Sequence, residues 1–82
     1  MTTYEGWANY QTWNVSLWIA NDYWLYVNAR NFSQKNGEKA TYEEFIKQMP
    51  EEYGDLSGDG VSWTDPTLDH YELNEFIQEL GE

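Results

Sequence analysis

Acidic side chains are the main candidates for chemistry in this sequence, and their sharpest local pattern is DLSGDG at residues 55–60. Asp55, Ser57 and Asp59 match positions 1, 3 and 5 of an EF-hand loop, where side-chain oxygens coordinate calcium. Position 12 of such a loop needs a bidentate glutamate, but Pro66 stands there. We therefore interpret the segment as an Asp/Gly-rich turn and keep calcium binding at Asp55, Ser57 and Asp59 as the alternative.

Carboxylates can also act as paired general acids and bases, but the sequence singles out no pair. His70 is the only histidine and there is no cysteine, so two-imidazole sites, thiolate nucleophiles and Cys-type zinc sites are excluded. His70 follows Asp69 at an expected helix start, where a capping or solvent-exposed histidine is commoner than a catalytic one. We predict a protein that is not an enzyme and uses no cofactor.

The acidity is confined to one half of the chain. Residues 1–40 contain three acids and three bases, whereas residues 41–82 contain twelve acids and only Lys47 as a base, which accounts for the whole net charge of −11. Such a surface repels nucleic acids and anionic membranes and attracts basic surfaces. The alternative is that the charge serves only solubility.

The expected last helix, residues 69–80, carries Glu72, Glu75 and Glu79 about one turn apart. This spacing puts neighbouring side chains roughly 5–6 Å apart at Cβ, a scale similar to that of phosphates along a nucleic-acid strand. We expect these glutamates to lie on the side of the helix opposite Phe76 and Leu80. The predicted partner-binding residues are Glu43, Glu44, Asp69, Glu72, Glu75 and Glu79.

Hydrophobic periodicity and capping residues predict four helices that position these acids. The expected helices cover residues 10–20, 23–33, 42–49 and 69–80, with Asn9, Asp22, a Thr41/Glu44 capping box and Asp69 at their starts. Gly37 supplies a left-handed conformation after the second helix, and Pro50 stops the third. We therefore predict an all-α fold, with residues 1–82 forming a single small domain.

An aromatic-rich core is expected, because rings make up 18% of the chain and each buries a large area. In the opening stretch the inward stripe is predicted to be Tyr10, Trp13, Leu17, Ala20 and Trp24, widened by Val15, Trp18 and Ile19, with Asn14 and Ser16 on the polar side. The expected inward residues of the second helix are Trp24, Leu25, Ala29 and Phe32, and those of the third are Tyr42, Phe45, Ile46 and Met49. In the last helix they are Tyr71 or Leu73, Phe76, Ile77 and Leu80.

The start of the chain lacks the basic and apolar regions of a secretory signal. No apolar run reaches the roughly 18–20 residues that span a bilayer. We therefore expect a cytoplasmic protein.

The segment NYQTWNVSLWIAND, residues 9–22, resembles the opening signature of a family of small acidic proteins found in tailed phages and in some prokaryotes. The matching residues are Asn9, Tyr10, Thr12, Trp13, Val15, Leu17, Trp18 and Asn21. Val61, Ser62 and Trp63 resemble a second Val-x-Trp element that precedes the last helix in that family. The resemblance implies a phage or mobile-element setting in a host cytoplasm, but no specific activity, because the family's function is uncharacterised.

Small acidic phage proteins are often inhibitors of host systems that handle nucleic acid, including restriction and CRISPR effectors. By analogy with them we form a first hypothesis about the function. In it, the chain is a non-enzymatic binding protein whose carboxylates mimic DNA and occupy Lys/Arg sites on a basic, nucleic-acid-handling host protein. It binds neither nucleic acid nor membrane directly. The alternative is a structural or assembly module, a homodimer included, that docks through exposed Tyr23, Tyr26 or Trp63.

Overall fold

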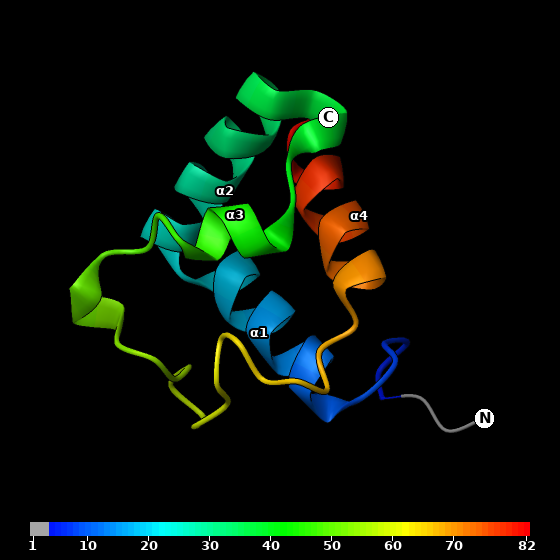
Figure 1. Ribbon diagram of the computed structural model, residues 1–82, viewed down its shortest axis with the longest axis vertical. Coiled ribbons are helices and arrows are strands. Elements are labelled where there is room, and N and C mark those ends of the chain that lie inside the picture. The colour runs from blue at the N-terminus through cyan, green and yellow to red at the C-terminus, as the bar shows by residue number, and fades with distance from the viewer. Residues whose placement is uncertain (1–3) are drawn as a thin grey trace.

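Four α-helices form the framework of the computed structural model, which describes residues 4–82 (Figure 1). They are α1 (Tyr10–Asn21), α2 (Tyr23–Asn36), α3 (Tyr42–Ile46) and α4 (His70–Leu80), and two short 3-10 turns, η1 (Gly37–Lys39) and η2 (Glu51–Tyr53), interrupt the connections. The described residues contain no strand, only isolated bridges between Tyr4 and Trp7 and between Leu56 and Ser62. The predicted all-α class is confirmed. None of the helices in this part of the chain is long and apolar enough to cross a membrane.

Helices α1, α2 and α3 begin at the caps that the sequence predicts, and α4 is capped by Asp69, which was predicted as its first residue. A side-chain oxygen of the cap accepts a hydrogen bond from a backbone N–H three residues later, which satisfies a donor that the helix itself leaves free. The four pairs are Asn9 with Thr12 at 2.8 Å, Asp22 with Leu25 at 3.0 Å, Thr41 with Glu44 at 3.3 Å, and Asp69 with Glu72 at 3.0 Å. Gly37 follows α2 with a φ of +58°, as expected of a residue that ends a helix.

The helices α2 and α4 pack side by side, and both contact α1, while the short α3 packs against α4 (Figure 1). Leu25 and Ala29 of α2 and Leu73 and Ile77 of α4 are at most 1% exposed, so the centre of the core lies between these two helices. Leu73 is therefore the inward residue of α4, and Tyr71, the other candidate, is 73% exposed.

Helix α1 buries only part of its predicted inward face, Val15 and Ile19, and it also buries residues that were predicted to be its polar side. Val15 and Ile19 are fully buried, as are the polar residues Asn14 and Ser16, which are at most 3% exposed, whereas Tyr10 is 38% exposed. Asn14 faces the loop between η2 and α4, and that loop supplies the hydrogen-bond partners that make its burial favourable. The prediction of Asn14 and Ser16 as the polar side was wrong, because Asn14 finds partners outside α1 and the Ser16 hydroxyl donates to the Trp13 carbonyl within the helix at 2.7 Å.

The aromatic rings of α1 and the start of α2 lie at the edge of the core rather than at its centre. Trp13, Trp18 and Trp24 are only partly buried, and the most deeply buried rings belong to Tyr42, Phe45 and Trp63 later in the chain. The Trp18 ring instead covers the 55–62 loop, and it packs so closely on Gly58 that a Cβ there would lie 2.3 Å from the ring. The core is thus aromatic-rich; Tyr42 and Phe45 were predicted to be inward, whereas Trp63 was predicted to be exposed.

Helix α3 is shorter than predicted. It ends at Ile46, and the chain tightens into i to i−3 hydrogen bonds, Gln48 N to Phe45 O at 3.0 Å and Met49 N to Ile46 O at 3.2 Å. After these tighter turns the backbone becomes extended at Pro50, before which a helix usually ends. Helix α2, by contrast, continues beyond the predicted residue 33 to Asn36.

Candidate acidic binding surface

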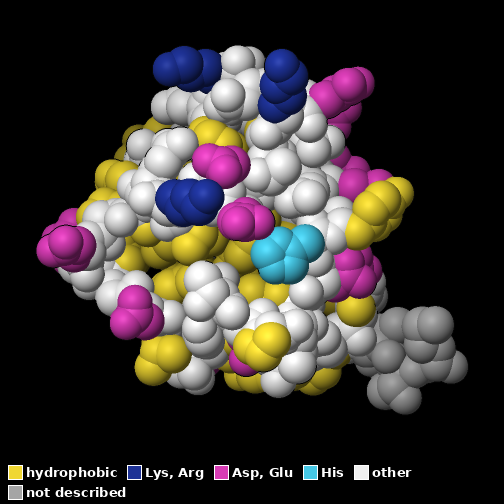
Figure 2. Space-filling model, in the orientation of Figure 1, with side chains coloured by type: hydrophobic (Ala, Val, Ile, Leu, Met, Phe, Trp, Pro, Cys, Tyr) yellow, Lys and Arg dark blue, Asp and Glu magenta, His cyan; other side chains and the backbone are white. Residues whose placement is uncertain are grey.

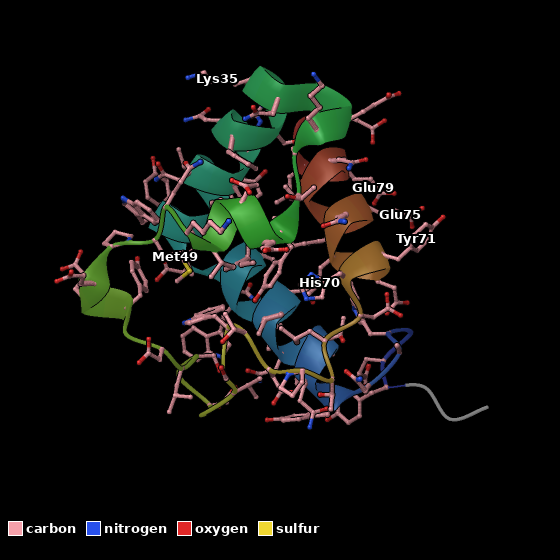
Figure 3. The ribbon with its side chains drawn as sticks, in the orientation of Figure 1. Lys35, Met49, His70, Tyr71, Glu75 and Glu79 are labelled. Carbon is pink, nitrogen blue, oxygen red and sulfur yellow. The ribbon has the colours of Figure 1, made fainter. Side chains whose placement is uncertain are left out.

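Two exposed glutamates, Glu75 and Glu79, form a ridge along α4, and we call this pair the α4 ridge. They lie one helical turn apart, on a side of the helix that faces away from the buried Leu73 and Ile77. Figure 3 shows both side chains pointing outward from α4 beside Tyr71. A hydrogen bond and charge repulsion from Glu75 raise the pKa of the Tyr71 hydroxyl above its usual value. Because both glutamates are exposed, the ridge is accessible to a partner.

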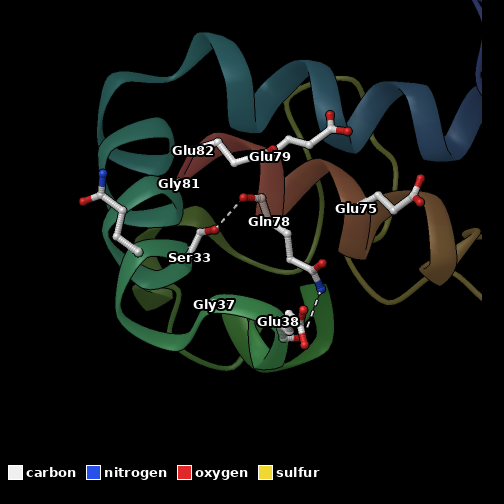
Figure 4. Close-up of a pocket in the computed structure, with 9 residues that line it drawn as sticks. Ser33, Gly37, Glu38, Glu75, Gln78, Glu79, Gly81 and Glu82 are labelled. Carbon is white, nitrogen blue, oxygen red and sulfur yellow. Dashed lines mark hydrogen bonds between the residues drawn. The ribbon is translucent and has the colours of Figure 1, made fainter.

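A hollow of about 440 Å³ lies on one side of the ridge, where α2 and α4 both end (Figure 4). We call it the helix-end hollow; its lining includes Ser33, Gly37, Gln78 and Gly81 together with the carboxylates of Glu38, Glu75, Glu79 and Glu82. Ser33 Oγ donates to the Gln78 carbonyl at 3.0 Å, and Gln78 Nε2 donates to the Glu38 carbonyl at 3.3 Å. These bonds hold the two helix ends together and bring four carboxylates around one opening.

The negative end of α4 at this hollow is not offset by a basic residue of its own, although α2 carries Lys35 in its last turn. A helix C-terminus carries a partial negative charge, which basic residues usually offset. Helix α4 has no basic residue in its last turn but has Glu79 there. Within residues 4–82 the one ion pair is Lys47 with Glu44 at 3.3 Å, on α3. Glu75 and Glu79 therefore have no basic partner within these residues and can attract an external cation.

An aromatic groove lies on the other side of the ridge. The groove, of about 240 Å³, is lined by Gly6, Trp7, Glu72, Glu75, Phe76 and Glu79. The Trp7 and Phe76 rings meet nearly edge to face, with centroids 5.7 Å apart and planes 77° apart. Phe76 was predicted opposite the glutamates, which was wrong: it follows Glu72 by four residues, and residues at that spacing share a helix face.

Two of the predicted binding residues also hold the fold. Asp69 caps α4 by accepting the Glu72 N–H, and Glu72 Oε1 accepts the backbone N–H of Ala8 at 2.8 Å. This second bond fastens the segment before α1 to α4. Both carboxylates are half-buried, so they are less free to pair with a partner than the α4 ridge.

Glu43 and Glu44 lie on a different surface, which is rich in lysine. Glu44 pairs with Lys47 and lines a hollow together with Lys35 and Lys39, and Glu43 lines another with Lys47 and His70. In Figure 2 the dark blue basic side chains lie over the end of α2 and over α3, while acidic side chains follow the edge formed by α4 and also lie over α3 and on the side away from α4. The structure therefore does not bring the six predicted acids onto one face.

Glu38 and Glu82 belong to the acidic surface but were absent from the predicted site. Each follows the end of a helix, α2 and α4 respectively, and the packing of α2 on α4 brings these ends to one hollow. The only cue in the sequence is their position just beyond two helix ends. That cue places them near each other only when α2 is known to pack against α4.

The whole chain, residues 1–82, matches a family of unknown function, DUF7249. The chain belongs to this family. Comparison with curated proteins and with solved structures found no match.

In this DUF7249 chain, the Asp/Gly-rich turn serves to attach the 55–62 loop to α1. Asp59 Oδ2 accepts hydrogen bonds from Asn14 Nδ2 at 2.8 Å and from Trp18 Nε1 at 2.9 Å, and Ser57 Oγ donates to Asn14 Oδ1 at 2.7 Å. A calcium ion at Asp55, Ser57 and Asp59 would have to compete with these bonds. The described residues of the DUF7249 chain include no group of three His, Cys, Asp or Glu side chains arranged to hold a metal.

The Asp59 contacts predict a pH dependence of stability. Hydrogen bonds from Asn14 and then Trp18 favour the carboxylate, so the pKa of Asp59 lies below its usual value of 3.8. Because the folded pKa is lower than the unfolded one, the stabilisation is complete above the unfolded pKa and is lost as the pH falls through the folded pKa. Asp59→Asn should therefore destabilise the protein at pH 7, and its difference from the wild type should shrink below about pH 4.

Urea denaturation at several pH values measures this difference. Asp55→Asn is the matched control, because it removes a charge from the same turn at an exposed position. A penalty for Asp59→Asn that stays constant from pH 7 to about pH 3 would contradict the role of the ionised carboxylate.

Proposed function

We propose that this DUF7249 protein is a non-enzymatic binding protein whose α4 ridge, with the hollows beside it, engages a basic surface of another protein. The observation that supports this most is the concentration of unpaired carboxylates at the negative end of α4, where an ordinary stable surface carries lysine or arginine. Like charges placed there cost free energy in the isolated protein. A basic partner would relieve that cost on binding.

The partner class that fits is a protein that handles nucleic acid. Its Lys/Arg sites are arranged for phosphates, and carboxylates held one helical turn apart on a rigid helix can occupy them in competition with a nucleic-acid strand. The resemblance of residues 9–22 to small acidic phage proteins supports a host target and an inhibitory, anti-defence role. The protein itself would then make no direct contact with nucleic acid, which its charge of −11 repels.

Capture from a host lysate on the immobilised protein, with elution in salt steps, tests the proposal. Nucleic-acid-handling proteins should elute by on the order of a few hundred mM salt, because exposed ion pairs are screened there, and added DNA should displace them. Partners that resist both salt and DNA, or the retention of no protein at all, would contradict the proposal.

A second candidate is assembly through aromatic surface, and one cluster favours it. Tyr4, Tyr10 and Trp13 form a partly exposed group with ring centroids 4.9 to 5.7 Å apart. Tyr23, at 84% exposure, is also available, but Trp63, predicted for this role, is 4% exposed and lies in the core. Self-association that persists at high salt, measured by sedimentation, would support this candidate over the acidic surface.

A further inference from the structure

The aromatic groove differs from the helix-end hollow because two of its six lining residues, Trp7 and Phe76, carry aromatic rings. Trp7 and Phe76 are partly buried against the core and meet edge to face. In such a pair at most one face of the Trp7 indole is covered by Phe76. The groove volume of about 240 Å³ is below the roughly 300–1,000 Å³ of pockets for drug-sized ligands, which fits a single side chain.

Trp7 is held in place before any ligand arrives. The Tyr4 and Trp7 backbones exchange hydrogen bonds at 2.8 and 2.7 Å across a turn in which Glu5 and Gly6 both have positive φ, +50° and +85°. The next residue, Ala8, donates its N–H to Glu72 Oε1 on α4. A tight turn and this bond thus hold the indole against α4, so little conformational entropy is lost when the groove is filled.

Charge and shape together specify the chemistry of an occupant. Electron-rich indole faces attract cations, and the three glutamates that line the groove supply carboxylates beside the rings. A guanidinium group is planar, stacks on aromatic rings and pairs with carboxylates through two parallel N–H bonds, whereas an ammonium is a compact, strongly hydrated point charge. The groove therefore favours arginine over lysine.

We propose that the aromatic groove binds an arginine side chain of the partner, with the guanidinium against Trp7 and paired with Glu75 or the free oxygen of Glu72. This assignment rests on the proposed function, because it names the residue that the acidic surface recognises. It adds a selectivity that charge alone does not provide. The helix-end hollow, which is lined by carboxylates without aromatic rings, would attract either basic residue.

Two flexible Gly/Ser peptides test the proposal, one carrying arginines and the other carrying lysine at each of the same positions. Calorimetry at low salt should show the arginine peptide binding roughly fivefold to tenfold more tightly, and the Trp7 indole N–H should shift in NMR spectra on its addition. Trp7→Leu should lower the arginine affinity to the lysine level, and Trp7→Phe should retain part of the preference. The comparison of peptides on the unaltered protein requires no variant to fold.

Equal affinities for the two peptides, with an unmoved Trp7 signal, would overturn the arginine assignment while leaving the proposed function intact. Failure of both peptides to bind at low salt would overturn the proposed function as well. Glu72→Gln provides a second readout, since the amide oxygen can still accept the Ala8 N–H while the charge is lost. It should weaken the arginine peptide more than Glu51→Gln, a matched change at an exposed site on η2.

Discussion

Replacing Asn14 with alanine should lower the free energy of unfolding by about 3 kcal/mol, a large share of the stability of a domain this small. Asn14 is fully buried and joins α1 to the 55–62 loop, since its Oδ1 accepts from Ser57 and its Nδ2 donates to Asp59. The variant leaves the Ser57 hydroxyl, in a side chain only 6% exposed, without its acceptor. Thermal unfolding should then occur roughly 15 °C lower.

Asn21→Ala is the matched control for this loss. Asn21 lies in the same helix and its Nδ2 also donates a hydrogen bond, to the Leu17 carbonyl at 2.9 Å, but the side chain is exposed. Its replacement should change stability by no more than about 0.5 kcal/mol. Similar melting temperatures for the two variants would show that the buried Asn14 network does not stabilise the fold.

Reversing the charge of the α4 ridge should have opposite effects on binding and on stability. Glu75→Lys with Glu79→Lys should weaken binding to a basic partner by at least about 100-fold, because two favourable ion pairs become repulsive. The same change places a cation in the last turn of α4 and removes neighbouring like charges. The free energy of unfolding should therefore stay level or rise, by up to about 1 kcal/mol at low salt.

Glu51→Lys with Glu52→Lys makes the same change of net charge at an exposed site on η2. Binding to this control should weaken far less than to the ridge variant, because its charges lie outside both hollows beside the ridge. Equal losses for both variants would mean that total charge governs the interaction, and that the geometry of α4 contributes nothing specific.

The helix boundaries could be predicted from the sequence because they depend on local chemistry. Asn9, Asp22, Thr41 and Asp69 each cap a helix by a bond to a residue three positions away, and such bonds are visible in a short window. The shortening of α3 before Pro50 concerns only the last turn, where boundaries are least certain from sequence.

The burial of Asn14 on α1 could not be predicted in this way. Rings and aliphatic residues surround this helix so widely that its periodicity allows more than one inward side. The choice is made by Ser57 and Asp59, more than 40 residues away, which satisfy Asn14 and allow it to be buried. Asn14 was predicted to face solvent because its hydrogen-bond partners are distant in the sequence.

The candidate site was partly predictable for the same reason. The spacing of Glu75 and Glu79 follows from the helix alone, whereas the inclusion of Glu38 depends on how α2 packs on α4. Glu72 bonds to Ala8, a contact across 64 residues that gives it a structural role no local pattern reveals. The position of Phe76 beside Glu72, by contrast, follows from helix geometry and could have been deduced.

The separation of lysines from the α4 carboxylates has a consequence for the speed of encounter. Lys35, Lys39 and Lys47 lie around α3 and the end of α2, whereas the edge formed by α4 carries acidic side chains and no basic ones in this view, and further acids lie over α3 and on the opposite side of the molecule (Figure 2). The molecule therefore has an electric dipole as well as a net charge, and the field of a basic partner exerts a torque on it during diffusion. Collisions would begin with the side away from the lysines already turned toward the partner, which raises the association rate constant and makes it fall with ionic strength.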